Sequence, residues 1–312
     1  MKLTATTIRR SLGTVLAFGA VAGLVGCAGG SDSGRPQVGV TLLTEAHVFY
    51  QDLKRGLQEA ADSIGIDLHI VAGEWDLARQ TAQVQNFITR EMDAIVIAPV
   101  NSSGIVSAVS EANEVGIPVF TADIAADGGT IRSHIASDNK QGGRLLGEYI
   151  AQRLGGSGNV AILDQPTVAS VRDRVAGFRE ALESYPGITI VAEPAVERGL
   201  RDVAKQKTDN LLSSGRPIDA IYGSNDDCAL GALAALGAAG RTDVIVVGYD
   251  ATPEARTAIA SGTLLVADAV QDPVEIGRRT IEVVAQALAG EEVPPVVAVP
   301  VSLVTRDSLV GN

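Results

Sequence analysis

The sequence contains few of the residues that build disulfide or metal sites. It has two cysteines and three histidines in 312 residues. One disulfide at most can form between Cys27 and Cys228, so the fold does not depend on a disulfide framework. The histidines, His47, His69 and His134, are far apart and lack carboxylate or cysteine companions at ligand spacing. We therefore expect no metal site and no cofactor.

Motifs for covalent or phosphate chemistry are also missing. There is no Gly-x-Ser-x-Gly sequence, and no Walker-type lysine follows a glycine-rich loop. The glycine-rich segment 155–158 precedes a predicted strand, so it fits a turn that ends a helix rather than a dinucleotide-binding loop. We expect the protein not to be an enzyme.

Positive charge is in short supply, and this limits the possible partners. The chain has 25 Lys and Arg against 37 Asp and Glu, a formal net charge of −12. An acidic surface repels phosphate backbones, so nucleic acid is not an expected partner.

The first 26 residues have the pattern of an export signal. Lys2, Arg9 and Arg10 form a positive start, and residues 12–25 are apolar or small and uncharged. This stretch is too short and too glycine-rich for a membrane-spanning helix. We predict a signal peptide at 1–26, with the Sec and twin-arginine export routes both open.

The signal ends in Leu24-Val25-Gly26-Cys27, which resembles the bacterial lipobox, where the cysteine is acylated. Acyl chains at Cys27 would hold the protein on the outer face of the cell membrane without a spanning helix. Residues 27–36 would then be a lipidated flexible tether. Cys228 would lack a disulfide partner, and we expect it to be a small buried residue.

From residue 37 onward, short β-branched runs alternate with longer amphipathic stretches, as in α/β proteins with parallel sheets. Two helices have clear boundary signals, at 138–154 and 253–260. The length and rhythm predict two similar α/β lobes, each built from one of two successive series of strands and helices. The expected strands are 37–43, 67–72, 94–98, 117–121, 133–136, 159–163, 188–192, 219–222, 244–249, 264–269 and 299–305.

Polar residues follow the predicted strands, at the sheet edge where doubly wound folds bind ligands. These residues are Asp123, Asn225, Asp226, Asp227, Asp250 and Gln271. A carboxylate or amide can engage two neighbouring hydroxyls, and a buried polar group is costly without a partner, so such a set favours a polyhydroxylated ligand. The alternative is that they begin turns and helices, where Asp and Asn are common.

Aromatic residues make up only 4% of the chain, yet Phe49 and Tyr50 are adjacent just after the first strand. Their faces could stack on the C–H surface of a sugar, or they could be ordinary packing at a helix start. Trp75, the single tryptophan, could contact ligand or pack against its own loop.

Three segments resemble the ribose-binding protein family, the periplasmic sugar-binding components of ABC importers. They are SHIASDN at 133–139, SNDDCALGA at 224–232 and VVGYDATP at 246–253. The resemblance spans about 37–305 and implies an α/β periplasmic binding protein of type I, whose two doubly wound αβα domains are joined by a three-crossing hinge. The crossings would fall near Ser137, Gln271 and Ser302.

The resemblance also implies domain limits and ligand-binding residues. The N-terminal lobe would comprise 37–137 plus 272–302, and the C-terminal lobe 138–271 plus 303–312. The implied ligand-binding residues are His47, Phe49, Tyr50, Asp123, Arg172, Asn225, Asp250 and Gln271.

Three positions depart from the family's ribose pattern. Ile124 stands where ribose binders have an arginine, Gly199 near an expected aromatic residue, and Leu43 in place of a small polar residue. These changes alter which hydroxyl pattern is tolerated, so we do not predict ribose itself as the ligand.

The resemblance implies a monomeric lipoprotein that captures a monosaccharide or related polyol and delivers it to an ABC importer permease. A sensor that presents its closed form to a membrane receptor is the alternative. A sugar-responsive regulator of the lactose-repressor family would need a DNA-reading helix-turn-helix before residue 37, where the lipobox stands.

Overall fold

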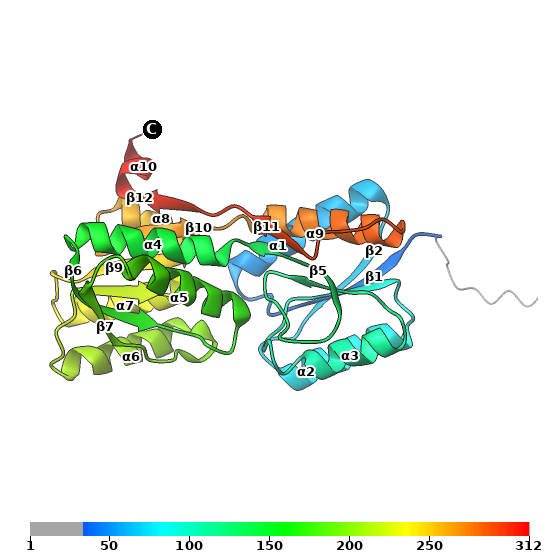
Figure 1. The fold of residues 1–312 in the computed structure, drawn as a ribbon, viewed down its shortest axis with the longest axis horizontal. Coiled ribbons are helices and arrows are strands. Elements are labelled where there is room, and N and C mark those ends of the chain that lie inside the picture. Colours follow the sequence, from blue (N-terminus) through cyan, green and yellow to red (C-terminus); the bar gives the residue numbers. More distant parts are fainter. Residues whose placement is uncertain (1–33, 312) are drawn as a thin grey trace, which may run out of the picture. The chain divides into compact units, whose positions relative to one another are not determined.

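The computed structural model describes residues 34–311 (Figure 1). The predicted signal peptide at 1–26, the lipidated Cys27 and most of the tether lie outside the described residues. Within residues 34–311, no helix is both long and apolar enough to cross a membrane.

The first half of the described chain alternates strands and helices around one sheet. Its elements are β1 (Gln37–Leu42), α1 (Val48–Ile64), β2 (Asp67–Ala72), α2 (Leu77–Thr89), β3 (Ala94–Ile97), α3 (Val106–Glu114), β4 (Val119–Ala122) and β5 (Ile131–Ser137). The strand order is β11-β5-β4-β3-β1-β2, and every pairing is parallel. His69 and His134 lie on strands β2 and β5, as predicted.

The second half repeats this plan in a second sheet. Its elements are α4 (Asn139–Arg153), β6 (Ser157–Leu163), α5 (Ala169–Leu182), β7 (Gly187–Ala192), η1 (Glu197–Gly199), α6 (Arg201–Ser213), β8 (Ala220–Gly223), α7 (Asp226–Ala238), β9 (Ile245–Asp250), α8 (Pro253–Ala260) and β10 (Leu265–Val270). The strand order is β12-β10-β9-β8-β6-β7, with only β12 antiparallel.

The C-terminal segment returns to both sheets. Its elements are α9 (Pro273–Leu288), β11 (Val296–Val299), β12 (Ser302–Thr305) and α10 (Arg306–Val310). The chain therefore passes between the sheets three times: after β5, after β10, and between β11 and β12. The predicted α/β fold with two doubly wound αβα domains is confirmed.

One predicted strand is corrected by the structure. The segment 299–305 was expected as a single strand, but it contains the end of β11 and all of β12, which belong to different sheets. Pro300 lies between the two strands. It has no N–H to donate to a ladder, so pairing stops there and the chain changes sheets.

Other local predictions are confirmed. Helix α8 has the predicted bounds 253–260, with Thr252 as its N-cap and Pro253 in its first turn. Helix α4 is capped by Asp138, whose side chain accepts from the backbone N–H of Gln141. It ends before Gly155 and Gly156, whose φ angles of 64° and 81° suit glycine.

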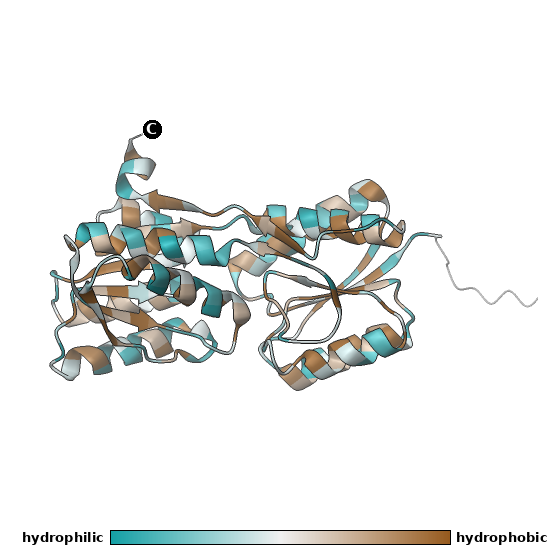
Figure 2. Cartoon of the chain, viewed as in Figure 1, coloured by the Kyte–Doolittle hydropathy of each residue, from teal (hydrophilic) through white to brown (hydrophobic). Residues whose placement is uncertain are grey.

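Apolar residues run along the strands, whereas the helices alternate between hydrophobic and hydrophilic residues (Figure 2). All four residues of β3 and all four of β8 are buried, as expected for strands covered on both faces. Cys228 is fully buried in α7 as a free thiol, which confirms the prediction for this residue.

Helices α4 and α5 pack with their backbones almost in contact. A Cβ atom added to Gly143 of α4 would lie 1.9 Å from the carbonyl oxygen of Arg174, and one added to Gly177 of α5 would lie 1.9 Å from that of Lys140. Only glycine fits at either place. This close packing fixes the backbone of α5 at Arg174.

We expect Gly143→Ala to lower the free energy of unfolding by about 2 kcal/mol or more, because the backbones of α4 and α5 must separate to admit a methyl group. Urea unfolding measures this change. The matched control is Gly237→Ala on the exposed side of α7, where an added Cβ meets nothing within 4 Å. It should be neutral or stabilise by about 0.5–1 kcal/mol. Equal effects at the two glycines would contradict the packing argument.

Candidate functional site

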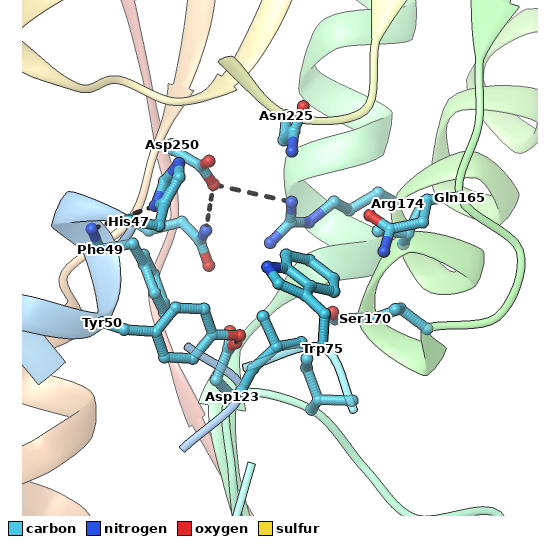
Figure 3. Close-up of a pocket in the computed structure, with 15 residues that line it drawn as sticks. His47, Phe49, Tyr50, Trp75, Asp123, Gln165, Ser170, Arg174, Asn225 and Asp250 are labelled. Carbon is cyan, nitrogen blue, oxygen red and sulfur yellow. Dashed lines mark hydrogen bonds and ion pairs between the residues drawn. The ribbon is translucent and has the colours of Figure 1, made fainter. Parts of the chain in front are cut away.

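A pocket lies beyond the carboxyl ends of the parallel strands, where doubly wound folds bind small molecules. Side chains from both sheets' domains contribute to it (Figure 3). Seven of the eight predicted ligand-binding residues line it: His47, Phe49, Tyr50, Asp123, Asn225, Asp250 and Gln271. The remaining lining residues are Leu43, Trp75, Ile124, Gln165, Val168, Ser170, Val171 and Arg174.

Asp123 follows β4 and contributes a buried carboxylate. Its side chain accepts a hydrogen bond of 2.6 Å from the Tyr50 hydroxyl through Oδ2, whereas Oδ1 is buried without a hydrogen-bond partner. Burial raises the pKa of Asp123 to about 6, against the opposing effects of Arg174 and the Tyr50 hydroxyl. The backbone has φ 66°, which is uncommon for a residue other than glycine. Asp123 is thus held in a costly state that offers an acceptor to a ligand.

Asp250 and Gln271 form a second polar group, at the ends of β9 and β10. The Gln271 amide donates a hydrogen bond of 2.6 Å to Asp250 Oδ1, and its own Oε1 is buried without a partner. Asp250 Oδ1 also lies 3.6 Å from Arg174 Nη1 in a buried ion pair. Burial raises the pKa of Asp250, and the charge of Arg174 opposes this rise.

Arg174 is a buried guanidinium, and the protein already engages most of it. Nε donates to Asn139 Oδ1 at 2.8 Å, and Nη1 donates to the backbone oxygen of Ser224 at 2.9 Å. The guanidinium carbon stands 3.8 Å from the centroid of the Tyr249 ring, in cation–π geometry. Arg174 is the one Arg or Lys in the pocket lining, and its charge faces Asp250.

The predicted residue Arg172 does not line the pocket. Its side chain is 40% exposed and forms an ion pair with Asp127. Side chains that are two residues apart on a helix point in different directions, so Arg172 and Arg174 of α5 cannot both face the pocket. The signal for Arg174 was its place on the buried stripe with Ser170, Val171 and Phe178, at helical spacing.

Aromatic residues of the first domain form one wall. His47 caps α1, because its Nδ1 accepts from the backbone N–H of Phe49 at 3.2 Å. The rings of Phe49 and Tyr50 meet edge to face, with centroids 5.2 Å apart. These residues therefore take part in helix-start packing and also face the pocket.

Trp75 belongs to the pocket, although the sequence left its role open. Glu74 and Trp75 both have positive φ angles, 52° and 61°. The Glu74 carboxylate accepts from Thr44 Oγ1 at 2.7 Å and from the Glu45 backbone N–H at 2.9 Å. These bonds hold the loop in a conformation that turns the indole toward the cavity (Figure 3).

Asn225 has a structural and a pocket role at once. Its Oδ1 caps α7 by accepting from the backbone N–H of Cys228 at 2.8 Å, and its Nδ2 donates to the Gly199 carbonyl at 3.2 Å. A Cβ atom on Gly199 would lie 2.6 Å from that Nδ2. Of the three departures from the ribose pattern, Leu43 and Ile124 line the pocket and Gly199 supports it.

The chain matches the model of the "Periplasmic binding protein domain" over residues 38–292. The ribose import binding protein of Escherichia coli (strain K12) is 34% identical over 270 residues, which cover 86% of this chain and 90% of that protein. The xylitol-binding protein of Mycolicibacterium smegmatis is 32% identical over 311 residues, covering 97% and 87%. The chain belongs to the periplasmic binding protein family.

A solved structure supports the same family. An ABC transporter solute-binding protein from Bacillus halodurans C-125 with bound myo-inositol superposes with a TM-score of 0.83 at 32% identity, covering 90% of this chain and 98% of that one. The periplasmic binding protein relatives are binding proteins, so the expectation of a non-enzyme is confirmed. The family is extracytoplasmic. Residues 34–311 of this family member contain no cluster of three or more potential metal ligands.

We expect Asp123→Asn to stabilise this periplasmic binding protein at pH 7.5. An aspartate has a pKa of about 3.9 in an unfolded chain, against about 6 for folded Asp123. The folded form therefore binds this proton more tightly, and that advantage is lost as the pH rises to 6. The variant avoids the charge and keeps an acceptor for Tyr50, so the gain should be about 1–3 kcal/mol at pH 7.5.

Urea unfolding at pH 4 and pH 7.5 measures this effect, and the gain should shrink toward pH 4. Asp62→Asn is the control, because Asp62 is exposed on α1. A variant less stable than the wild type at pH 7.5 would show that the buried charge is well compensated.

Proposed function

We propose that this protein captures a monosaccharide or related polyol in the pocket and delivers it to an ABC importer permease. The observation that carries this proposal is the pair of buried acceptors without partners, Asp123 Oδ1 and Gln271 Oε1. Each such atom costs free energy until a donor reaches it. A ligand that carries several hydroxyl groups supplies those donors in one molecule.

The charge of the site favours a neutral ligand. Two carboxylates, Asp123 and Asp250, face the pocket, whereas Arg174 is already bonded to Asn139 and Ser224 and pairs with Asp250. A phosphate or carboxylate on the ligand would meet two negative groups without a free cation. Phosphorylated sugars and sugar acids are therefore poor ligands in this proposal.

The apolar part of the lining suits the C–H surfaces of a carbohydrate. Phe49, Tyr50 and Trp75 supply aromatic faces, and Leu43 and Ile124 add aliphatic surface. The named relatives bind ribose and xylitol, and one solved relative holds myo-inositol. These names support the class of small polyhydroxylated ligand.

Contacts near the pocket support a closed, ligand-retaining form. The backbone N–H of Ala169 donates to Ser102 Oγ at 3.0 Å, and Arg172 pairs with Asp127. Both contacts join the two halves of the chain. We propose domains at 37–137 plus 272–302 and at 138–271 plus 303–312, whose closure on ligand is recognised by the permease.

We further propose export through the signal peptide at 1–26 and a lipid anchor at Cys27, which would keep a monomeric receptor beside its permease on the outer face of the cell membrane. Presentation of the closed form to a membrane signalling receptor is the alternative to transport. Binding of the purified, ligand-loaded protein to an ABC importer permease or to a membrane signalling receptor would separate the two roles.

A thermal-shift screen with D-ribose, xylitol, myo-inositol and D-ribose 5-phosphate tests the ligand class. At a concentration 100 times its Kd, a ligand stabilises the folded protein by about 2.7 kcal/mol. For a chain of this size that corresponds to a rise in Tm of about 5 °C. We expect such a rise with at least one neutral compound and none with the phosphate. A rise with the phosphate alone would overturn the proposed charge selectivity.

Asp250→Asn tests the assigned pocket. A hydrogen bond to a charged group contributes about 1.5–3 kcal/mol, so the Kd for the compound found in the screen should rise about 10- to 100-fold. Arg172→Gln removes an exposed ion pair outside the pocket and should change the Kd at most about fivefold. Isothermal titration calorimetry measures both. A larger effect at Arg172 than at Asp250 would reverse the assignment.

A further inference from the structure

Two more carboxylates lie behind Asp250, outside the pocket lining. Asp226 is the first residue of α7 and Asp268 lies on β10, 42 residues further along the chain. Their side chains are 1% and 0% exposed. Neither residue lines the pocket, and neither forms an ion pair in the described part of the chain. Such burial of two acidic groups needs a physical explanation.

Each of the two carboxylates uses one oxygen to hold the chain just after Asp250. Asp226 Oδ2 accepts from the backbone N–H of Thr252 at 2.6 Å, and Asp268 Oδ1 accepts from that of Ala251 at 3.1 Å. The remaining oxygens, Asp226 Oδ1 and Asp268 Oδ2, are buried and have no protein donor. Two acceptor oxygens are therefore left unsatisfied in this inner space.

The two unpartnered oxygens converge over one glycine. A Cβ atom on Gly248 would lie 2.6 Å from Asp268 Oδ2 and 3.0 Å from Asp226 Oδ1. The absent side chain of Gly248 leaves room for both oxygens on the same side of β9. Two ionised carboxylates repel each other at such a place, whereas one proton between them turns the repulsion into a hydrogen bond.

We propose that Asp226 and Asp268 share one proton at neutral pH, and that this protonated pair positions Asp250 in the pocket. The second part rests on the proposed function, because it takes Asp250 as a ligand-binding residue. The pair acts through the backbone: its outer oxygens hold the N–H groups of Ala251 and Thr252, and its inner oxygens hold each other.

The electrostatics of the two carboxyl groups agree with this arrangement. Burial is the largest cause that raises the pKa of Asp268 well above its ordinary value, and the neighbouring charge of Asp226 raises it further. Burial also raises the pKa of Asp226, with the hydrogen bond to Asp268 as the largest opposing effect. Each carboxyl group thus acts on the pKa of the other, which agrees with one proton that serves both.

The groups around the pair offer little compensation for a second negative charge. Asp250 on β9 adds a like charge, and Arg174 on α5 lies beyond it. From α8, Arg256 donates to the Ala251 carbonyl rather than to a carboxylate. On β12, the residue opposite Asp268 is Val304. On α7, Cys228 is a thiol, and burial raises its pKa to about 12.

The loop that the pair holds is conformationally strained. Asp250 has φ 117° and Ala251 has φ 54°, both in the region that favours glycine. Such angles persist only where the surroundings fix them. When the shared proton is lost, repulsion between Asp226 and Asp268 separates their outer oxygens from the two N–H groups. Asp250 then loses its support, so ligand binding should weaken as the pH rises above neutral.

Infrared difference spectroscopy of the ligand-free protein at pH 7.5 tests the shared proton directly. The spectrum of the wild type minus that of Asp268→Asn should show the carbonyl stretching band of a protonated carboxyl group. The control is Asp202→Asn at an exposed position of α6, whose difference spectrum should lack this band. No such band in the difference spectrum would overturn the proposal.

Hydrogen exchange of the ligand-free protein at one pH tests the positioning. Asp268→Asn keeps an acceptor for Ala251 and gains an N–H donor toward Asp226, so the amides of Ala251 and Thr252 should stay protected. Asp268→Ala removes both the acceptor and the donor at this position. Exchange of the Ala251 and Thr252 amides should then be at least tenfold faster, while the core strands stay protected. Equal protection of the two amides in both variants would show that the pair does not hold the loop.

Affinity for the screened sugar or polyol at pH 7 and pH 9.5 then links the pair to binding. The wild type should bind at least fivefold more weakly at pH 9.5, and Asp268→Asn should lose this dependence. An affinity without pH dependence in the wild type would overturn the role in binding. If no compound of the screen binds at all, the proposed function fails, and the infrared and exchange results still decide the shared proton and the positioning of the loop.

Discussion

The buried pair of Arg174 and Asp250 is the interaction on which the site depends. The guanidinium ties together α4 through Asn139, the end of β8 through the Ser224 carbonyl, and β9 through Asp250 and Tyr249. A buried ion pair adds little net stability, because desolvation of both charges offsets their attraction. Its value here is geometric, since it sets where the carboxylate of Asp250 stands relative to the rest of the pocket.

The pocket contains strained and unsatisfied groups that lower the stability of the ligand-free protein and favour ligand binding. Asp123 and Asp250 occupy backbone conformations that favour glycine, and Asp123 Oδ1 and Gln271 Oε1 are buried without donors. Strain and unsatisfied acceptors of this kind persist where a rigid surrounding structure enforces them. The rigidity comes from tight helix packing, such as the contact of Gly143 with the backbone at Arg174. A ligand that supplies donors relieves part of this cost, which is what makes the pocket selective.

The paired carboxylates Asp226 and Asp268 are a second set of costly buried groups, and they lie behind the pocket residue Asp250. They do not line the pocket, yet they hold the strained turn that carries Asp250. In this proposal, the protonation state of the Asp226–Asp268 pair determines the position of Asp250 in the pocket.

The sequence by itself determined the elements that depend on neighbours along the chain. Periodicity and capping signals placed the alternating strands and helices, the exact bounds of α8, and the polar residues that follow the strands. Local reasoning failed where the answer depended on distant segments. Pro300 separates two strands whose partners, β5 and β10, lie far away along the chain. Arg172 was implied by the family resemblance, and the structure places Arg174, two residues further on, in the pocket lining.

The same limit explains Trp75 and the acidic pair. The sequence could not tell whether Trp75 faces the pocket, because bonds from Thr44 and Glu45 to Glu74 turn that loop. It marked Asp226 only as a residue after a strand, and it gave no sign of Asp268. The sequence gives the side chains of each segment, and short-range preferences determine its secondary structure. The convergence of two carboxylates over Gly248 was decided by the tertiary structure, because parallel strands bring side chains together that are 42 residues apart.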